Sequence, residues 1–206
     1  MRSLGSGNPL AKGHSQRDRH AYDLAYLGTH SEDRQPALEA LLIEPARRWP
    51  QGNFAVFGPG YPDDGWPRNV DREIHISPRE HPGFYGSQRF ALNLTRSAMK
   101  AAGFSPSVRL FEAASCATPI ISDWWEGLDS FFKIGKEILI AEDADTVLRY
   151  LHDTPEAERR AIGDAARNRI LAEHTAFHRA GQIEDALREM NGAKAGGLRE
   201  FTEAGA

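Results

Sequence analysis

The residues around position 107 have the types and spacing of an anion-binding helix start. Ser107 is well placed to cap a helix, so the first unpaired amides would belong to Val108, Arg109 and Leu110. Arg96 and Arg109 lie nearby in the sequence and would neutralise a negative charge. Unpaired amides and the helix dipole both favour anions at such a position, which indicates a diphosphate site. A plain helix cap at Ser107 is the alternative.

Glu112 adds a second kind of chemistry to the same helix. It follows Val108 by four residues and therefore lies about one turn further along the same face. The remainder of that helix is built from apolar and small residues, so an acid there is either exposed or hydrogen-bonded. A vicinal diol, such as the one on ribose, would satisfy a carboxylate with two donors. A solvated surface glutamate is the alternative that the pattern leaves open.

A second candidate phosphate site follows the first expected strand. Gly28 permits a close approach of the backbone, Thr29 supplies a hydroxyl, and Arg34 supplies a guanidinium beside a helix start. An ordinary strand-to-helix turn capped by Ser31 or Asp33 explains the same residues equally well.

A third candidate loop, after the fifth expected strand, holds two adjacent tryptophans, whereas the pair His174 and His178 and the single Cys116 are poor candidates. Trp124 and Trp125 are adjacent in a loop, where they would either cover a sugar or an opposing domain or pack together as a small cluster. His174 and His178 have a metal-compatible spacing, but no third ligand is nearby, so no metal site is predicted. Cys116 is expected to be a small core residue.

The elements that must position these residues follow from the alternation of short apolar runs with longer amphipathic ones. Strands this apolar are buried on both faces of a sheet. We expect strands at residues 23–28, 53–57, 70–76, 90–94, 119–122 and 138–141, and helices from Pro36 and at 81–88, 107–114, 145–152 and 156–190. This pattern predicts an α/β fold: a single Rossmann-like, doubly wound domain with a mainly parallel sheet of about six strands, helices on both faces and a long helical C-terminus. Ligands bind such sheets at the carboxyl ends of the strands, where all three candidate loops fall.

Composition sets the wider frame. The chain has 206 residues and a formal net charge of −4, which is ordinary for a globular protein and excludes a general nucleic-acid-binding protein. No apolar run approaches the roughly 18 residues of a membrane span, and the N-terminus lacks the apolar core of a signal peptide, so we expect a cytoplasmic protein. We expect a flexible basic arm at residues 1–20, a nucleotide-sugar-binding domain at 21–190 and a disordered tail at 191–206.

Four stretches carry a family resemblance: YDLAYLGT at 22–29, SEDRQP at 31–36, SPSVRLFEAA at 105–114 and PIISDWWEGL at 119–128. From Tyr22 to about His178, three quarters of the chain, the sequence resembles the C-terminal domain of bacterial glycosyltransferases related to the spore-maturation protein CgeB, which have GT-B architecture.

The resemblance implies that this domain holds a nucleoside-diphosphate sugar, with no further cofactor, while the acceptor enters from a separate N-terminal domain. Glu112 would then bind the ribose hydroxyls, and the segment around Ser77 would meet the base. The diphosphate would lie against residues from the two candidate anion sites, namely Gly28, Thr29, Arg34, Arg96, Ser105, Ser107, Val108 and Arg109.

The sequence departs from the GT-B pattern in two respects. Many retaining enzymes carry a second glutamate eight positions before the ribose-binding one, and that position is Phe104 here. Only the short arm precedes Tyr22, so we expect a fragment of a longer enzyme, a chain that works with a partner, or a domain that no longer catalyses. No catalytic residue is assigned. A non-catalytic nucleotide- or protein-binding module is the alternative function; a nucleotide-sugar epimerase and a receiver domain are weaker ones.

Overall fold

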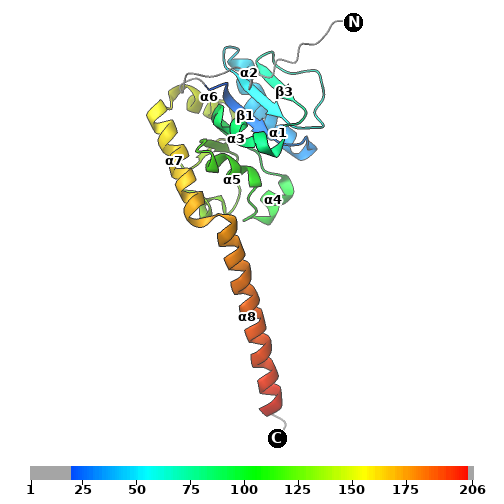
Figure 1. The fold of residues 1–206 in the computed structure, drawn as a ribbon. Coiled ribbons are helices and arrows are strands. Elements are labelled where there is room, and N and C mark those ends of the chain that lie inside the picture. Colours follow the sequence, from blue (N-terminus) through cyan, green and yellow to red (C-terminus); the bar gives the residue numbers. More distant parts are fainter. Residues whose placement is uncertain (1–19, 204–206) are drawn as a thin grey trace. The chain divides into compact units, whose positions relative to one another are not determined.

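The computed structural model describes residues 20–203, with side chains described through Met190. The arm expected at residues 1–20 thus lies outside the described residues except for His20, and so do the side chains of the tail expected at 191–206. The chain divides into two compact units, Met1–Arg167 and Asn168–Ala206. The first unit holds the sheet, and the described part of the second is helical (Figure 1).

Six strands of the described chain form a single sheet in the order β3-β2-β1-β4-β5-β6, with every neighbouring pair parallel. The strands are β1 (Tyr22–Leu27), β2 (Phe54–Phe57), β3 (Val70–Glu73), β4 (Gln88–Asn93), β5 (Ile120–Ser122) and β6 (Leu139–Ile140). β2 and β5 are buried at every position, as the apolar runs predicted. The strand order runs outward in opposite directions from β1 and β4, which confirms the doubly wound α/β fold.

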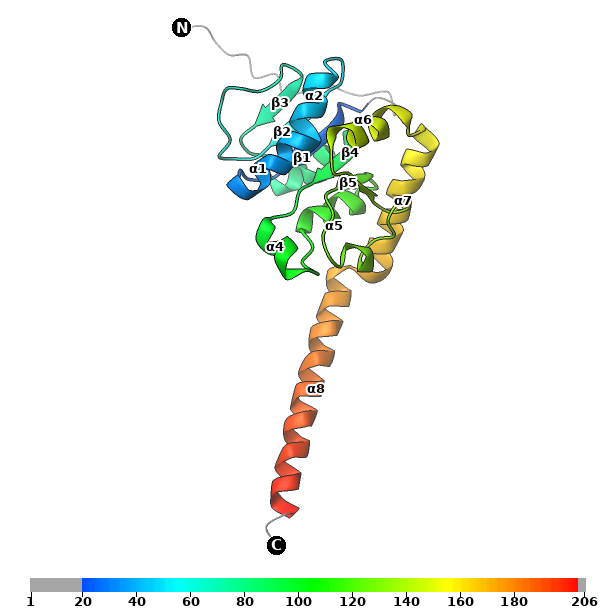
Figure 2. The ribbon, with the colours of Figure 1, turned by 180° about the vertical axis from the view of Figure 1, so that it is seen from behind.

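Helices cover both faces of this sheet. The α-helices of the described residues, in chain order, are α1 (Gln35–Leu38), α2 (Glu44–Arg48), α3 (His81–Gly86), α4 (Ser97–Ala102), α5 (Val108–Ser115), α6 (Ala144–Asp153), α7 (Glu156–Glu173) and α8 (Ala176–Glu203). α2 packs against α6 and α3 against α5, and Figures 1 and 2 show the sheet from its two sides. The long helical C-terminus is present as α7 and α8, with a break at residues 174–175, and the backbone of α8 continues past Met190 to Glu203.

The segment between α1 and α2 is a π-helical turn, η3 (Glu39–Ile43). Pro45 follows it, and a proline inside a helix removes one hydrogen bond and crowds the carbonyl four residues earlier. A wider turn just before the proline accommodates this conflict. The buried side chains of Leu38, Leu41 and Leu42 still face the sheet, as the sequence pattern predicted.

The central strands separate at their carboxyl ends. β1 and β4 are paired only as far as Ala25 and Ala91. Beyond that point β1 stays paired with β2 through Leu27, and β4 stays paired with β5 through Asn93. The pairing of β1 and β4 therefore ends before either strand does, at the switch point where an open α/β sheet binds its ligand. We call this gap in the strand pairing the crevice.

α4 is a helix that the sequence pattern did not predict. It is six residues long and contains no buried residue, so it leaves no apolar periodicity to read. Its start is held by Asp33, whose Oδ2 accepts a hydrogen bond from the Ser97 amide at 2.8 Å. Because this contact spans 64 residues, it depends on the tertiary fold.

None of the helices among residues 20–203 has both the length and the apolar character that a membrane crossing requires.

Candidate functional site

The crevice between β1 and β4 contains the guanidinium of Arg109. This residue belongs to the first turn of α5 and is only 8% exposed. Its Nε donates to the carbonyl oxygen of Leu27 at 2.5 Å, and its Nη1 donates to Oδ1 of Asn93 at 3.1 Å. The guanidinium also lies over the Tyr26 ring, 4.6 Å from its centroid. Arg109 thereby joins the ends of two strands that are no longer paired with each other there.

Gly28 lets the backbone approach this guanidinium, and Gly58 lets a second loop approach Gly28. A Cβ on Gly28 would lie 2.6 Å from Nη2 of Arg109, which is closer than real contacts allow. A Cβ on Gly58 would lie 2.1 Å from the carbonyl oxygen of Gly28, and Gly58 has a φ of +142°. The close approach expected at Gly28 is therefore real, and it brings the loops after β1 and β2 together at the edge of the crevice.

Arg34 is a second buried arginine on this edge, at 7% exposure. Its Nη2 donates to the carbonyl oxygen of Thr29 at 2.5 Å. Its Nε is buried and has no hydrogen-bond partner among the described residues. The Thr29 side chain is exposed, so the loop after β1 presents a hydroxyl outside and a guanidinium beneath.

A third buried arginine differs from Arg34 and Arg109 because it is paired with a carboxylate. Arg159, at 4% exposure, donates to both carboxylate oxygens of Glu156, at 2.8 and 2.6 Å. It lies at the amino end of β4, where it also binds the carbonyl oxygen of Arg89. Arg34 and Arg109 bond only to neutral acceptors among the described residues. Buried charges are costly unless they are paired, so the carboxyl edge carries positive charge that an external anion can balance.

Glu112 extends from α5 toward α3. Tyr85 donates to its Oε2 at 3.2 Å, and Nδ1 of His81 lies 3.3 Å from its Oε1. The Glu112 side chain is 35% exposed, so it is neither a freely solvated surface acid nor a core residue. Burial raises the pKa of the Tyr85 hydroxyl above its ordinary value, which keeps it protonated as a donor near neutral pH.

The start of α5 is capped as expected, because Oγ of Ser107 accepts a hydrogen bond from the Arg109 amide at 3.4 Å. The Val108 side chain is 68% exposed, and Ser105 is half-buried in the preceding loop. Part of the helix start is thus occupied by its own cap.

Arg96 lies at the other side of this edge. It is exposed and precedes α4 directly. Ser31 also donates to the carboxylate of Asp33. This bond, followed by that from the Ser97 amide, lowers the pKa of Asp33. The predicted turn residues Ser31 and Asp33 therefore connect the loop after β1 to α4.

Ser77 caps the short turn η4 (Pro78–Glu80), which leads directly into α3. Its Oγ accepts from the Arg79 amide, and its own amide donates to Oε2 of Glu80 at 3.0 Å. The cap fixes the start of the segment that carries His81.

A buried polar network at the ends of β4 and β5 was missed by the sequence reasoning. Oδ1 and Oδ2 of Asp123 accept hydrogen bonds from the hydroxyl and amide of Thr95, at 2.8 and 3.1 Å. Lys100 of α4 pairs with the same carboxylate at 2.8 Å. Asn93 donates to Oγ of Ser122 at 2.9 Å. Polar residues at the end of otherwise apolar strands were the available signal.

The two tryptophans have different environments. Trp124 is 45% exposed, whereas Trp125 is 2% exposed. Phe104, at 62% exposure and with a φ of +48°, packs its ring where a Cβ on Gly127 would lie. Trp125 is therefore packed, as the cluster interpretation predicted, whereas a covering role for the exposed Trp124 stays a prediction.

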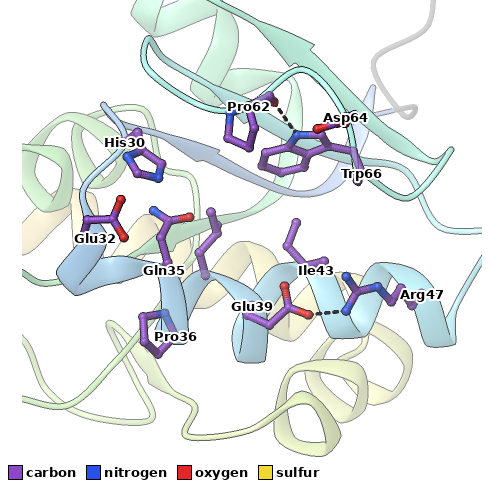
Figure 3. Close-up of a pocket in the computed structure, with 12 residues that line it drawn as sticks. His30, Glu32, Gln35, Pro36, Glu39, Ile43, Arg47, Pro62, Asp64 and Trp66 are labelled. Atoms are coloured by element: carbon purple, nitrogen blue, oxygen red, sulfur yellow. Dashed lines mark hydrogen bonds and ion pairs between the residues drawn. The ribbon is translucent and has the colours of Figure 1, made fainter.

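A hollow of about 590 Å³ lies between the α1–α2 segment and the loop after β2, and it reaches the loop after β1 at His30 and Glu32 (Figure 3). Leu38, Ile43 and Trp66 contribute apolar surface to it, and Glu39 and Arg47 bond to each other on its helical wall. Glu112 and Arg109 do not line it. Within residues 20–203, no three histidine, cysteine or acidic side chains come together as a metal site would require.

Comparison with known proteins gives the family. Residues 34–185 match the model of the Glycosyl transferase-like family, so the chain belongs to that family. No curated protein sequence matches the chain.

Solved structures show the same fold. Sucrose-phosphate synthase from Thermosynechococcus elongatus has 17% identity and a TM-score of 0.65, over 86% of this chain and 47% of the other. HepE from Anabaena, solved with UDP-glucose, has 13% identity and a TM-score of 0.63, over 81% and 48%. The C-terminal domain of a group 1 glycosyl transferase from Francisella tularensis has 14% identity and a TM-score of 0.57, over 77% and 88%. This chain thus spans about half the length of the first two structures and most of the third, which is itself a C-terminal domain.

Proposed function

We propose that this chain is the donor-binding half of a GT-B glycosyltransferase, which transfers a sugar from a nucleoside diphosphate to an acceptor. The observation that carries the proposal is the pair of buried arginines, Arg34 and Arg109, without carboxylate partners at the crevice between β1 and β4. A diphosphate would supply the missing negative charge. The resemblance to CgeB-related enzymes remains a prediction about the subtype.

In this proposal the donor lies across the crevice. Its phosphates meet Gly28 and the loop after β1 on one side and the α5 start near Ser107 on the other. Glu112 receives the ribose hydroxyls, and the segment at Ser77 meets the base. The departing diphosphate is stabilised by fixed positive charges and amide dipoles, which need no rearrangement when the sugar leaves.

Glycosyl transfer also needs a surface that faces this edge. A closed cleft orients the acceptor and excludes water from the reacting sugar. Because the chain spans about half the length of sucrose-phosphate synthase and of HepE, we assign the acceptor site and the group that receives the acceptor proton to a further domain or a partner chain.

The proposal is tested by calorimetric titration of the full chain with UDP, ADP, GDP and CDP. We expect saturable binding of at least one of them. Glu112→Ala weakens that binding by about 1–3 kcal/mol, the loss expected for a charge-assisted hydrogen bond. Glu158→Ala, which removes an exposed glutamate from α7, is the control and leaves the affinity unchanged. Equal affinities for the Glu112→Ala variant and the native chain contradict the proposal.

A further inference from the structure

The carboxylate of Glu112 is held from two directions by α3. Oε2 accepts the Tyr85 hydroxyl at 3.2 Å, and Oε1 lies 3.3 Å from Nδ1 of His81. A glutamate side chain on an open helix face samples many rotamers, and a ligand must then freeze one of them. In this structure the contacts with α3 already hold the Glu112 side chain in one rotamer.

We propose that Tyr85 and His81 are positioning residues that orient the Glu112 carboxylate for a vicinal diol. The inference rests on the proposed function, in which that diol belongs to the donor ribose. Each carboxylate oxygen has two lone pairs, and on each oxygen one of them accepts a hydrogen bond from a side chain of α3. One acceptor position is left on each oxygen, which matches the two adjacent hydroxyls of a ribose.

The holding residues are themselves fixed. Tyr85 is 1% exposed, and Thr118 donates to its carbonyl oxygen at 2.8 Å. The His81 ring meets the Tyr85 ring edge-on at a centroid distance of 6.4 Å. The Ser77–Glu80 capping box sets the turn that leads into His81. Ser77, whose segment is expected to meet the nucleotide base, thus also helps to position His81.

The chain offers a matched control for the Tyr85 bond. Tyr22, 7% exposed, donates to Oδ2 of Asp71 at 3.2 Å. It is also a buried tyrosine bonded to a carboxylate at the same distance. It lies at the amino end of β1, on the opposite edge of the sheet from the crevice. Tyr22→Phe therefore removes the same interaction away from the candidate site.

The test compares two ligands by calorimetry: the tightest-binding of UDP, ADP, GDP and CDP, and its 2′,3′-dideoxy counterpart. We expect Tyr85→Phe to weaken the ribonucleotide about 3- to 10-fold, the range of one lost hydrogen bond. The dideoxy nucleotide, which has no diol, keeps its affinity. Tyr22→Phe changes neither constant.

His81 supplies a second variant in case Tyr85→Phe does not fold. We expect His81→Ala to lower the affinity for the ribonucleotide and to leave the affinity for the dideoxy nucleotide unchanged. His81→Gln, which keeps a hydrogen-bond donor, should have most of the native affinity for the ribonucleotide. A loss that is equal for both ligands, or no loss while Glu112→Ala does weaken the ribonucleotide, overturns the positioning role alone. A Glu112→Ala variant that binds like the native chain overturns the proposed function itself.

Discussion

Nε of Arg109 donates a hydrogen bond to the carbonyl oxygen of Leu27 at 2.5 Å, across the gap where β1 and β4 part. Nη1 of the same guanidinium reaches Asn93 at the end of β4. One side chain from α5 therefore joins both sides of the crevice and places its positive charge in the floor. Arg109 therefore has both a structural role, through its hydrogen bonds to the two strands, and an electrostatic role, through its charge.

The first prediction separates these two contributions. Arg109→Met keeps an extended apolar stem but removes the charge and the donors. We therefore expect the affinity for the tightest-binding nucleoside diphosphate to fall about 10-fold or more, where each tenfold is about 1.4 kcal/mol. The affinity for the corresponding nucleoside, which has no phosphate, falls less than about twofold if the charge acts on the diphosphate. Calorimetry with both ligands gives the ratio.

Arg159→Met is the matched control, because Arg159 is also buried but pairs with Glu156 at the opposite edge. We expect Arg159→Met to lower the free energy of unfolding. The ratio of the affinities for the nucleoside diphosphate and the nucleoside should stay as it is in the native chain. If Arg109→Met weakened binding of the nucleoside as much as that of its diphosphate, the guanidinium would act through structure alone.

The second prediction concerns Gly58. A Cβ there would lie 2.1 Å from the carbonyl oxygen of Gly28, in a backbone conformation with positive φ. We expect Gly58→Ala to lower the free energy of unfolding by about 2–4 kcal/mol in urea denaturation. Gly65→Ala has a φ of +85° but open space around the new Cβ, so it costs only about 1 kcal/mol. Equal losses would show that the two loops do not need their close approach.

The third prediction concerns Ala117, a non-glycine residue with a φ of +55° at the end of α5. Glycine adopts this helix-ending conformation without the steric cost of a Cβ. We expect Ala117→Gly to raise the free energy of unfolding by about 0.5 kcal/mol, after the greater chain entropy of glycine is subtracted. Ala161→Gly, in the exposed middle of α7, should lower it by about 1 kcal/mol. Thermal unfolding of both variants checks the sign.

The fourth prediction concerns acid stability. Hydrogen bonds from Arg159 and then Arg160 lower the pKa of Glu156 from 4.5 to about 2. A depressed folded-state pKa means that the ion pair contributes fully above pH 4.5 and is lost as the pH falls through about 2. Because 47% of the Glu156 side chain is exposed, we expect a contribution of about 1 kcal/mol.

The measurement is urea unfolding of the native chain and of Glu156→Gln between pH 7 and pH 2. The variant should be less stable at pH 7, and the difference should close toward pH 2. A difference that stayed constant over this range would assign the stability to packing instead of charge.

Much of this fold was predictable because its inner strands are apolar on both faces, although the edge strand β3 (VDRE) buries only Val70. Runs such as Phe54–Phe57 have one stable environment, the middle of a parallel sheet, and the helix starting at Pro36 showed its buried face in Leu38, Leu41 and Leu42. α4 was not predictable, because its residues bury nothing and its cap comes from Asp33.

The site shows the same division. Ser107 as a cap is a local property, and it was predicted from its neighbours in the sequence. Gly28 was predicted as a close-approach glycine from its strand-to-helix turn, but the group that approaches it, the Arg109 guanidinium, comes from another element. The partners of Arg109 and Glu112 come from other elements. Leu27 lies 82 residues from Arg109, and Tyr85 lies 27 from Glu112. Such contacts are created by the strand order and have no local signal.

The most direct test of the account is a crystal structure of the full chain with the nucleoside diphosphate that it binds best. We predict density for the diphosphate in the crevice between β1 and β4, over Gly28 and the start of α5, with both ribose hydroxyls on Glu112. Nucleotide bound in the hollow beside Trp66, or with its ribose away from Glu112, would contradict it.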